Sequence, residues 1–257
     1  MNRFLIALLL LSTSLCSQEF PSKADDITYD WLMNSANHTD HVAIFKKIFS
    51  KVKVKTFLEF GVGLSTKYFT DHCNKVVSVE FVTHGSGPET IKRYIDFYQD
   101  CYNWTPIVFF TGYQSDTGWA AYKYLGSNAV YKANSYQSAN QRTYAPLDDF
   151  YILELNAFTK SLIKTRPIEV AFVDCSLYLR GDLVQVLFDK SPIIVGHATS
   201  IRYCGLVDDV YGYSHIQTPL NYEEIFIAHG SGCTVWIEKK EQYKELVEEL
   251  KRYANSP

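Results

Sequence analysis

The sequence predicts an α/β fold built on a mostly parallel, doubly wound sheet, and three observations support this prediction. Short apolar runs alternate with amphipathic segments along most of the chain, which is typical of strands joined by crossover helices. The first apolar run ends in a Gly-x-Gly bend that opens a helix. Near the C-terminus, two apolar runs flank a Gly-rich turn, which predicts an antiparallel hairpin at the end of the sheet.

Each element follows from its own pattern. Apolar runs predict strands at 56–60, 75–82, 106–111, 168–173, 192–196, 224–228 and 233–238. Amphipathic spacing predicts helices at about 41–49, from 64, and at 89–100, 150–164, 179–190 and 241–253. We expect Thr39 or Asp40 to cap the first of these helices.

Composition bounds the class of protein. A chain of 257 residues suits one domain and is ample for a full core. With 47% hydrophobic and 21% charged residues, general disorder is excluded. The net charge of −3 gives no electrostatic reason to expect nucleic acid or an anionic membrane as the main partner. The six cysteines show no CxxC spacing, so neither a disulfide framework nor a zinc site is predicted from them.

The N-terminus has the pattern of a secretory signal. Arg3 precedes an apolar run at 4–11, and small polar residues follow to position 17. This order predicts a cleaved or anchoring segment at 1–17, a domain at 18–257, and a protein that is secreted, periplasmic or membrane-anchored. A membrane contact is expected only through this segment, if it stays uncleaved. The alternative is an ordinary buried N-terminal helix.

Residues 112–148 interrupt the alternation of strands and helices. The segment is polar, contains Gly and Ser, and is crowded with Tyr and Trp. A stretch of this length without a clear period is usually a functional loop or lid. We expect either an inserted aromatic-rich loop that covers a substrate or a small satellite core.

The strongest candidate site is the bend after the first strand together with an acid on the next strand. Gly61 and Gly63 let the backbone approach a ligand, and the following helix offers free N–H groups. Glu80 ends the next strand, where a carboxylate can accept hydrogen bonds from ribose hydroxyls. The alternative is a tight turn and a surface glutamate. A dinucleotide fingerprint would have a third glycine at position 66, where this chain has Thr66, and no Gly-Lys-Ser/Thr phosphate loop is present.

These residues resemble a known family. The segment 57–66 (FLEFGVGLST) resembles the first motif of class I S-adenosylmethionine-dependent methyltransferases, and 77–80 (VSVE) resembles their second. The segments 170–174 (VAFVD) and 192–197 (PIIVGH) are similar to strands of the small-molecule O-methyltransferase-like branch. The resemblance covers roughly residues 40–240, and it implies a Rossmann-like sheet of seven strands with an antiparallel C-terminal hairpin strand.

The resemblance also implies roles for individual residues. S-adenosylmethionine would be the cofactor, with Glu59, Gly61 and Gly63 along its methionine moiety. Ser65 would contribute at the helix start, and Glu80 would bind the ribose.

Two further residues are candidates for catalysis. Asp174 and His197 end neighbouring strands, at the edge where open α/β sheets bind ligands. Asp174 would lie near the methyl group, and His197 could act as a general base; the alternatives are a helix cap and a structural histidine. Ala198 stands where metal-dependent relatives have an acid, so no metal is expected. Arg180 could bind an anionic substrate, although an exposed helix start is favoured.

The sequence thus predicts methyl transfer from S-adenosylmethionine to a small-molecule acceptor, at oxygen. A catalytically silent, exported nucleotide- or ligand-binding protein on the same fold is the main alternative, since fold alone does not prove activity. Export would also separate the protein from a cytosolic cofactor. An NAD-dependent oxidoreductase is less favoured, because the third glycine is missing and the terminal hairpin does not fit. The oligomeric state is not predicted.

Overall fold

The computed structural model describes residues 21–34, 40–82, 87–111, 130–133, 167–175, 180–188, 190–203 and 211–256. The predicted N-terminal segment 1–17 and the predicted helix 150–164 lie outside these ranges. So does the interrupting segment 112–148, apart from one short strand. Within the described ranges, no helix combines the length and the apolar character needed to cross a membrane.

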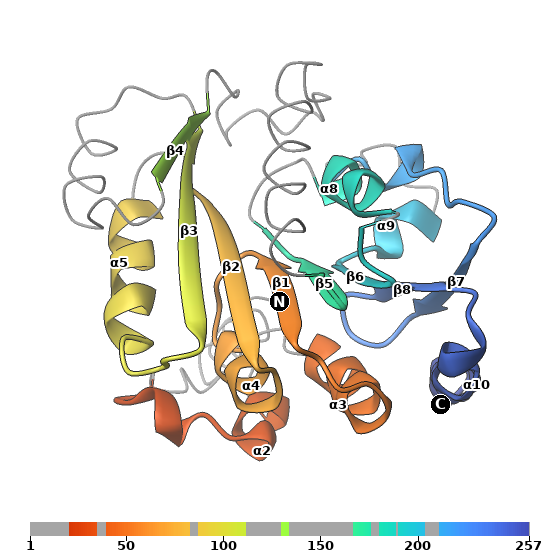
Figure 1. The fold of residues 1–257 in the computed structure, drawn as a ribbon, viewed down its shortest axis with the longest axis horizontal. Helices are drawn as coiled ribbons and strands as arrows, with labels where there is room; N and C mark the ends of the chain where they lie inside the picture. The colour runs from red at the N-terminus through yellow and green to blue at the C-terminus, as the bar shows by residue number, and fades with distance from the viewer. Residues whose placement is uncertain are drawn as a thin grey trace, which may run out of the picture.

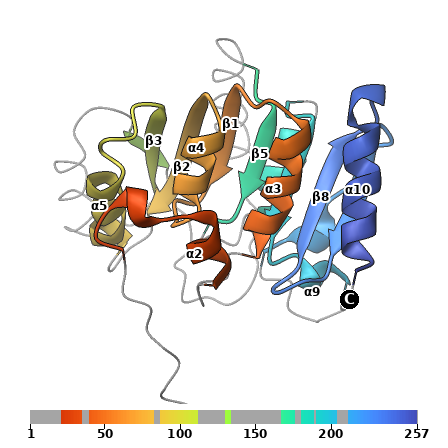
Figure 2. The same cartoon turned by 90° about the horizontal axis from the view of Figure 1, so that it is seen from below.

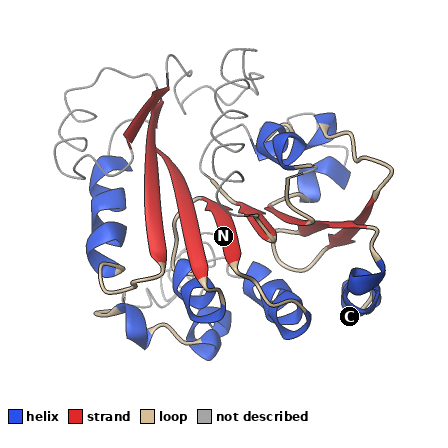
Figure 3. Ribbon diagram, viewed as in Figure 1, coloured by secondary structure: helices blue, strands red, loops and turns tan. Residues whose placement is uncertain are grey.

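One sheet of eight strands forms the centre of the molecule, in the order β4-β3-β2-β1-β5-β6-β8-β7 (Figures 1 and 3). Neighbouring strands are parallel except at β8, which is antiparallel to both β6 and β7. The strands are β1 (Thr56–Phe60), β2 (Lys75–Val82), β3 (Trp104–Thr111), β4 (Val130–Ala133), β5 (Val170–Val173), β6 (Ile193–His197), β7 (Tyr222–Ile227) and β8 (Cys233–Glu238).

Helices cover both faces of this sheet (Figure 1), and Figure 2 shows one of these faces from below. One face carries α2 (Tyr29–Asn34), α3 (His41–Lys51), α4 (Thr66–His72), α5 (Gly87–Phe97) and α10 (Lys244–Ala254). The other carries α8 (Arg180–Leu187) and the short 3-10 helix Tyr213–His215, with α9 (Ser200–Tyr203) nearby. The remaining short 3-10 helices are Ala24–Asp26 and Glu241–Tyr243.

The alternation of side chains along the strands explains why both faces are covered. In β1, Phe57 packs into the core under α3 and α4, whereas Leu58 and Phe60 pack into the core under α8. All five residues of this strand are buried. A strand buried on both sides needs a continuous apolar run rather than an alternating one, which is the pattern of the sequence here.

The predicted fold class is confirmed, including the antiparallel strands at the C-terminus. The bounds of β1, β2 and β8 are those expected, and the other predicted strands shift by one or two residues. The sheet gains one strand beyond the predicted seven: β4, from within 112–148, pairs in parallel with Val108 to Thr111 of β3. A short run such as VYKA has too little apolar pattern to be recognised without its partner strand.

The bend after β1 depends on Gly61, which adopts a φ of 105°. A Cβ atom at this position would lie 2.4 Å from the carbonyl oxygen of Asp174, at the end of β5. Glycine is therefore required here both for its backbone angle and for the close approach of two strand ends. Gly63 differs, because a Cβ there would have no atom within 4 Å.

We predict that Gly61→Ala lowers the free energy of unfolding by at least about 1–3 kcal/mol. The strained backbone angle costs alanine about that much, and the contact of its methyl group with the backbone after β5 adds to it. Chemical denaturation of the parent and variant measures the difference. Gly63→Ala is the matched control and should unfold near the parent midpoint. Equal stability of the Gly61 variant and the parent would contradict this account of the bend.

Candidate active site

The candidate site lies along the edge where the parallel strands end. β2, β1, β5 and β6 are neighbours in the sheet, so residues at their carboxyl ends follow one another along this edge. Glu80, the bend at 61–63, Asp174 and His197 thus come together in the predicted order. Open α/β sheets bind their ligands at such an edge.

The bend and Glu80 form one unit. The backbone N–H of Val62 donates to Glu80 Oε2 at 2.7 Å, and the N–H of Gly61 donates to the carbonyl of Val79 at 2.8 Å. Glu80 is only 9% exposed, so the alternative of a surface glutamate is wrong. A carboxylate is therefore fixed directly beside the glycine bend, as a nucleotide-binding site requires.

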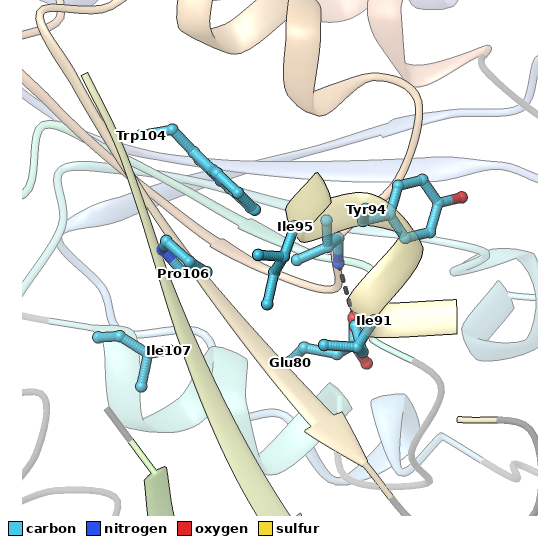
Figure 4. Close-up of a pocket in the computed structure, with 8 residues that line it drawn as sticks. Glu80, Ile91, Tyr94, Ile95, Trp104, Pro106 and Ile107 are labelled. Carbon is cyan, nitrogen blue, oxygen red and sulfur yellow. Dashed lines mark hydrogen bonds between the residues drawn. The ribbon is translucent and has the colours of Figure 1, made fainter. Parts of the chain in front are cut away.

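Glu80 and Val62 border a narrow hollow (Figure 4). Its other walls come from α5 and β3, and they are apolar: Ile91, Tyr94, Ile95, Trp104, Pro106 and Ile107. As it stands the hollow has no room for a water molecule, so a ligand base would fit only if these side chains moved apart. What the hollow offers is an apolar wall next to a carboxylate.

Glu59 is fully buried under the bend. Its Oε1 accepts hydrogen bonds from the Ser78 hydroxyl and from Thr66 Oγ1, while Oε2 has no hydrogen-bond partner among the described residues. Burial raises the pKa of Glu59 from 4.5 to about 8, outweighing both hydrogen bonds, so the neutral acid predominates at pH 7. A buried oxygen without a partner is costly, and a ligand donor would offset that cost.

Thr66, which replaces the third glycine of a dinucleotide fingerprint, has a structural explanation. Its hydroxyl accepts from the Gly63 N–H at 3.2 Å and donates to Glu59 at 2.8 Å. Thr66 thereby connects the bend to the buried acid. Ser65 occupies the N-cap position of α4 and is buried, but its side chain makes no capping hydrogen bond.

A network of charged groups surrounds His197. Its Nδ1 lies 2.8 Å from Asp174 Oδ1, and its Nε2 lies 3.2 Å from Asp40 Oδ1 and 2.7 Å from Ser231 Oγ. Asp40 Oδ2 also accepts from the backbone N–H of Ser231 at 3.1 Å. The ring is therefore held between two carboxylates, with its side chain only 8% exposed.

These contacts decide the protonation of the network. Burial alone would lower the pKa of His197, but the hydrogen bonds and charges of Asp174 and Asp40 outweigh it and raise the pKa from 6.5 to about 9. Burial also raises the pKa of the Asp40 and Asp174 carboxyl groups. Their contacts with His197 outweigh the effect of burial, so the pKa of each group is lowered. At neutral pH the ring is an imidazolium between two carboxylates. A general base needs a free lone pair, so the base role of His197 stays a prediction that this geometry does not favour.

Arg180 begins α8, but it is buried rather than exposed as the sequence predicted. It is 7% exposed, and its Nη1 lies 2.9 Å from Asp174 Oδ1. Its Nε donates to the carbonyl of Cys175 at 2.7 Å, and Nη1 donates to the carbonyl of His197 at 3.1 Å. The guanidinium holds the ends of β5 and β6 together and leaves little capacity for a substrate anion.

Asp40 was expected to cap α3 and instead takes part in the site. It stands at the N-cap position, but its side chain makes no hydrogen bond to the helix. It contacts Ser231 and His197, which lie 191 and 157 residues away. A local capping pattern gives no signal for such distant partners, and the hairpin turn that carries Ser231 gave none either.

Comparison with known proteins gives no match to the sequence but several to the fold. No protein-family model matches the chain, and no curated protein matches it either. Among solved structures, the chain is similar to an SAH-bound methyltransferase from Podospora anserina, at 14% identity and a TM-score of 0.42, over 93% of this chain and 97% of that one.

Two bacterial structures are similar to a comparable extent. An O-methyltransferase from Bacillus cereus in complex with SAH shares 13% identity at a TM-score of 0.47, over 91% of this chain and 97% of that one. A putative caffeoyl-CoA O-methyltransferase from Staphylococcus aureus shares 12% identity at a TM-score of 0.46, over the same fractions. The Rossmann-like class of the fold stands on the strand order and the antiparallel β8 described above.

The network around His197 predicts a pH dependence of stability. Because the pKa is higher in the folded state, the stabilisation is complete below pH 6.5 and is lost as the pH rises through about 9. We expect the His197 contribution to the free energy of unfolding to fall by roughly 2–4 kcal/mol over this interval. Chemical denaturation at several pH values measures it.

His197→Gln should remove this part of the pH dependence, although the variant is less stable throughout. His215→Gln, which changes an exposed histidine, is the control and should retain the parent slope. A slope above pH 6.5 that is the same in all three proteins would show that His197 does not carry the effect.

Proposed function

We propose that this protein transfers a methyl group from S-adenosylmethionine to a small-molecule acceptor, at oxygen. The observation that carries the proposal is the Glu80 carboxylate, which is fixed by the Val62 N–H beside the glycine bend and borders the same apolar hollow. A ribose needs an acceptor for its hydroxyls, and a base needs a flat apolar wall next to it. One edge of the sheet offers both.

The residues around the bend fit the rest of such a cofactor. Space beside Gly63 is open, since a Cβ there would meet no atom within 4 Å. The bend also leads into α4, whose N-terminal dipole favours a carboxylate, although the N–H groups of Thr66 and Lys67 already donate to the carbonyls of Gly63 and Leu64. Glu59 Oε2 has no hydrogen-bond partner among the described residues, and a ligand ammonium group there would favour the ionised carboxylate and donate to it. We assign Glu59, Gly61, Gly63, Ser65 and Glu80 to cofactor binding on this basis.

When bound, the cofactor supplies an electrophilic methyl group on sulfur. The protein's part is to hold the acceptor in line with that group and to exclude water. Asp174 is suited to orient an acceptor hydroxyl, because its carboxylate is ionised, partly exposed and fixed by Arg180 and His197. His197 is better suited to fixing Asp174 than to accepting a proton, since its Nε2 already faces Asp40.

A silent, exported ligand-binding protein is the second candidate. It is favoured by the same engagement of His197, which leaves no evident strong base among the described residues of the edge. It would also agree with an N-terminal export signal, which stays a prediction for residues 1–17. The two candidates share the cofactor site and differ in turnover, so binding and activity must be measured separately.

Calorimetric titration of the purified full-length chain tests the site. We expect S-adenosylmethionine and S-adenosylhomocysteine to bind and NAD not to bind. Binding with release of S-adenosylhomocysteine from a panel of small hydroxyl compounds supports the enzyme, and binding without turnover on any of them supports the silent protein. Binding of NAD alone would overturn both in favour of an oxidoreductase.

We predict that Glu80→Ala weakens S-adenosylhomocysteine binding by about 10- to 100-fold, because hydrogen bonds to a charged group contribute about 1.5–3 kcal/mol. Glu241→Ala, which removes a glutamate that is 88% exposed, is the control and should bind as the parent does. Thermal unfolding verifies that the Glu80 variant is folded. Unchanged affinity in a folded Glu80 variant would remove the ribose assignment.

A further inference from the structure

Three potential metal ligands meet at the end of the sheet edge, beyond the proposed cofactor site. The ligand atoms of Asp40, His41 and His197 all lie within 4.8 Å of one another. We propose that these three side chains bind a divalent transition metal ion of the Zn²⁺ type. This site goes beyond methyl transfer and does not depend on it.

The geometry suits such an ion. Two ligands at about 2.0–2.1 Å from a tetrahedral zinc lie about 3.3 Å apart, and Asp40 Oδ1 lies 3.2 Å from His197 Nε2. The three ligands come from two elements of regular structure. Asp40 and His41 lie at the start of α3, and His197 is the last residue of β6. The His41 ligand atom lies within 4.8 Å of the other two and would have to move closer to complete a three-ligand face.

The outer contacts of His197 are those of a metal-bound histidine. Ligating histidines usually donate their second ring N–H to a carboxylate, which fixes the tautomer and the ring. Here Nδ1 donates to Asp174, and Asp174 is itself fixed by Arg180 at 2.9 Å. This arrangement orients Nε2 toward Asp40 and His41, so the ring already has the orientation that a metal ligand requires.

The surroundings favour a transition metal over Mg²⁺ or Ca²⁺. Two imidazoles and one carboxylate suit zinc, nickel, cobalt or iron, whereas the hard cations prefer a shell of oxygen atoms. His41 is 3% exposed, and its ring centroid lies 4.7 Å from that of Phe172 and 5.0 Å from that of His197. Ser231 Oγ, 2.7 Å from Nε2, or a water would take the fourth position.

The charges around the cluster also favour a cation. Asp40 and Asp174 carry two negative charges, and Arg180 Nη1, 2.9 Å from Asp174 Oδ1, compensates one of them. A divalent ion held by Asp40, His41 and a neutral His197 would compensate the other.

The same atoms also follow the order of a hydrolase triad, Ser231–His197–Asp174. Asp40 argues against that function. A triad histidine must accept the serine proton on Nε2, and here a second carboxylate, Asp40 Oδ1, lies 3.2 Å from that nitrogen. In a triad, the Asp40 carboxylate would compete with the serine for Nε2. In a metal site, it would be a ligand.

Zinc titration of the untagged, full-length protein tests the proposal. The protein is stripped with a chelator, dialysed and titrated with ZnCl₂ by calorimetry, and MgCl₂ is the comparison ion. We expect one zinc per chain and at least tenfold weaker binding of magnesium. Asp40→Asn and His197→Gln should each weaken zinc binding at least tenfold, whereas the exposed-site control His215→Gln should bind as the parent does.

Circular dichroism verifies that each variant is folded. Asp40→Asn is the mildest substitution, because the asparagine side chain has nearly the same shape as that of aspartate. Absence of zinc binding to the folded parent, or unchanged affinity in both folded cluster variants, would overturn the proposal. A failure of S-adenosylmethionine binding would leave this result unaffected, because the zinc measurement does not involve the cofactor.

Discussion

The contact between the Gly61 backbone and the carbonyl of Asp174 is the constraint on which the sheet edge depends. It brings the ends of β1 and β5 together at a distance that no side chain permits. The N–H of Asp174 donates to the carbonyl of Phe60 at 2.8 Å, which joins the same two strand ends. With the bend held there, Val62 faces Glu80 on one side, and Asp174 faces His197 on the other.

The two proposed sites share one scaffold. On the β2 side of the bend lie a carboxylate and an apolar wall, which suit a nucleoside. On the β6 side lie Asp40, His41 and His197, which suit a cation. Arg180 connects β5 to β6 and contacts Asp174, which in turn contacts His197.

Much of the fold could be predicted from the sequence, because its signals are local. The apolar run of β1, the bend at Gly61 and the turn before β8 each lie within a few neighbouring residues, and each predicted the observed element. The strand β4 was missed for the opposite reason. Its place in the sheet comes from pairing with β3, and its four residues carry no pattern of their own.

The residues of the candidate site form the same two groups: some carry a local sequence signal and others do not. Glu59, Glu80, Asp174 and His197 could be placed near one edge because each lies close to the carboxyl end of an apolar run. Asp40 and Ser231 could not be placed there. Asp40 lies 157 residues from His197 and reaches it only in the folded chain. Ser231 reaches it from a hairpin turn that gave no signal of a site. Arg180 looked exposed because charged residues at helix starts usually are, and its burial depends on partners at two other strand ends.

The central claim is that a nucleoside binds beside the glycine bend with its ribose on Glu80. A crystal structure of the protein grown with S-adenosylhomocysteine tests it most directly. We expect density for the ligand with its ribose hydroxyls on the Glu80 carboxylate and its base against the apolar wall from α5 and β3. A ligand bound elsewhere, with the Glu80 hollow unchanged, would contradict the account.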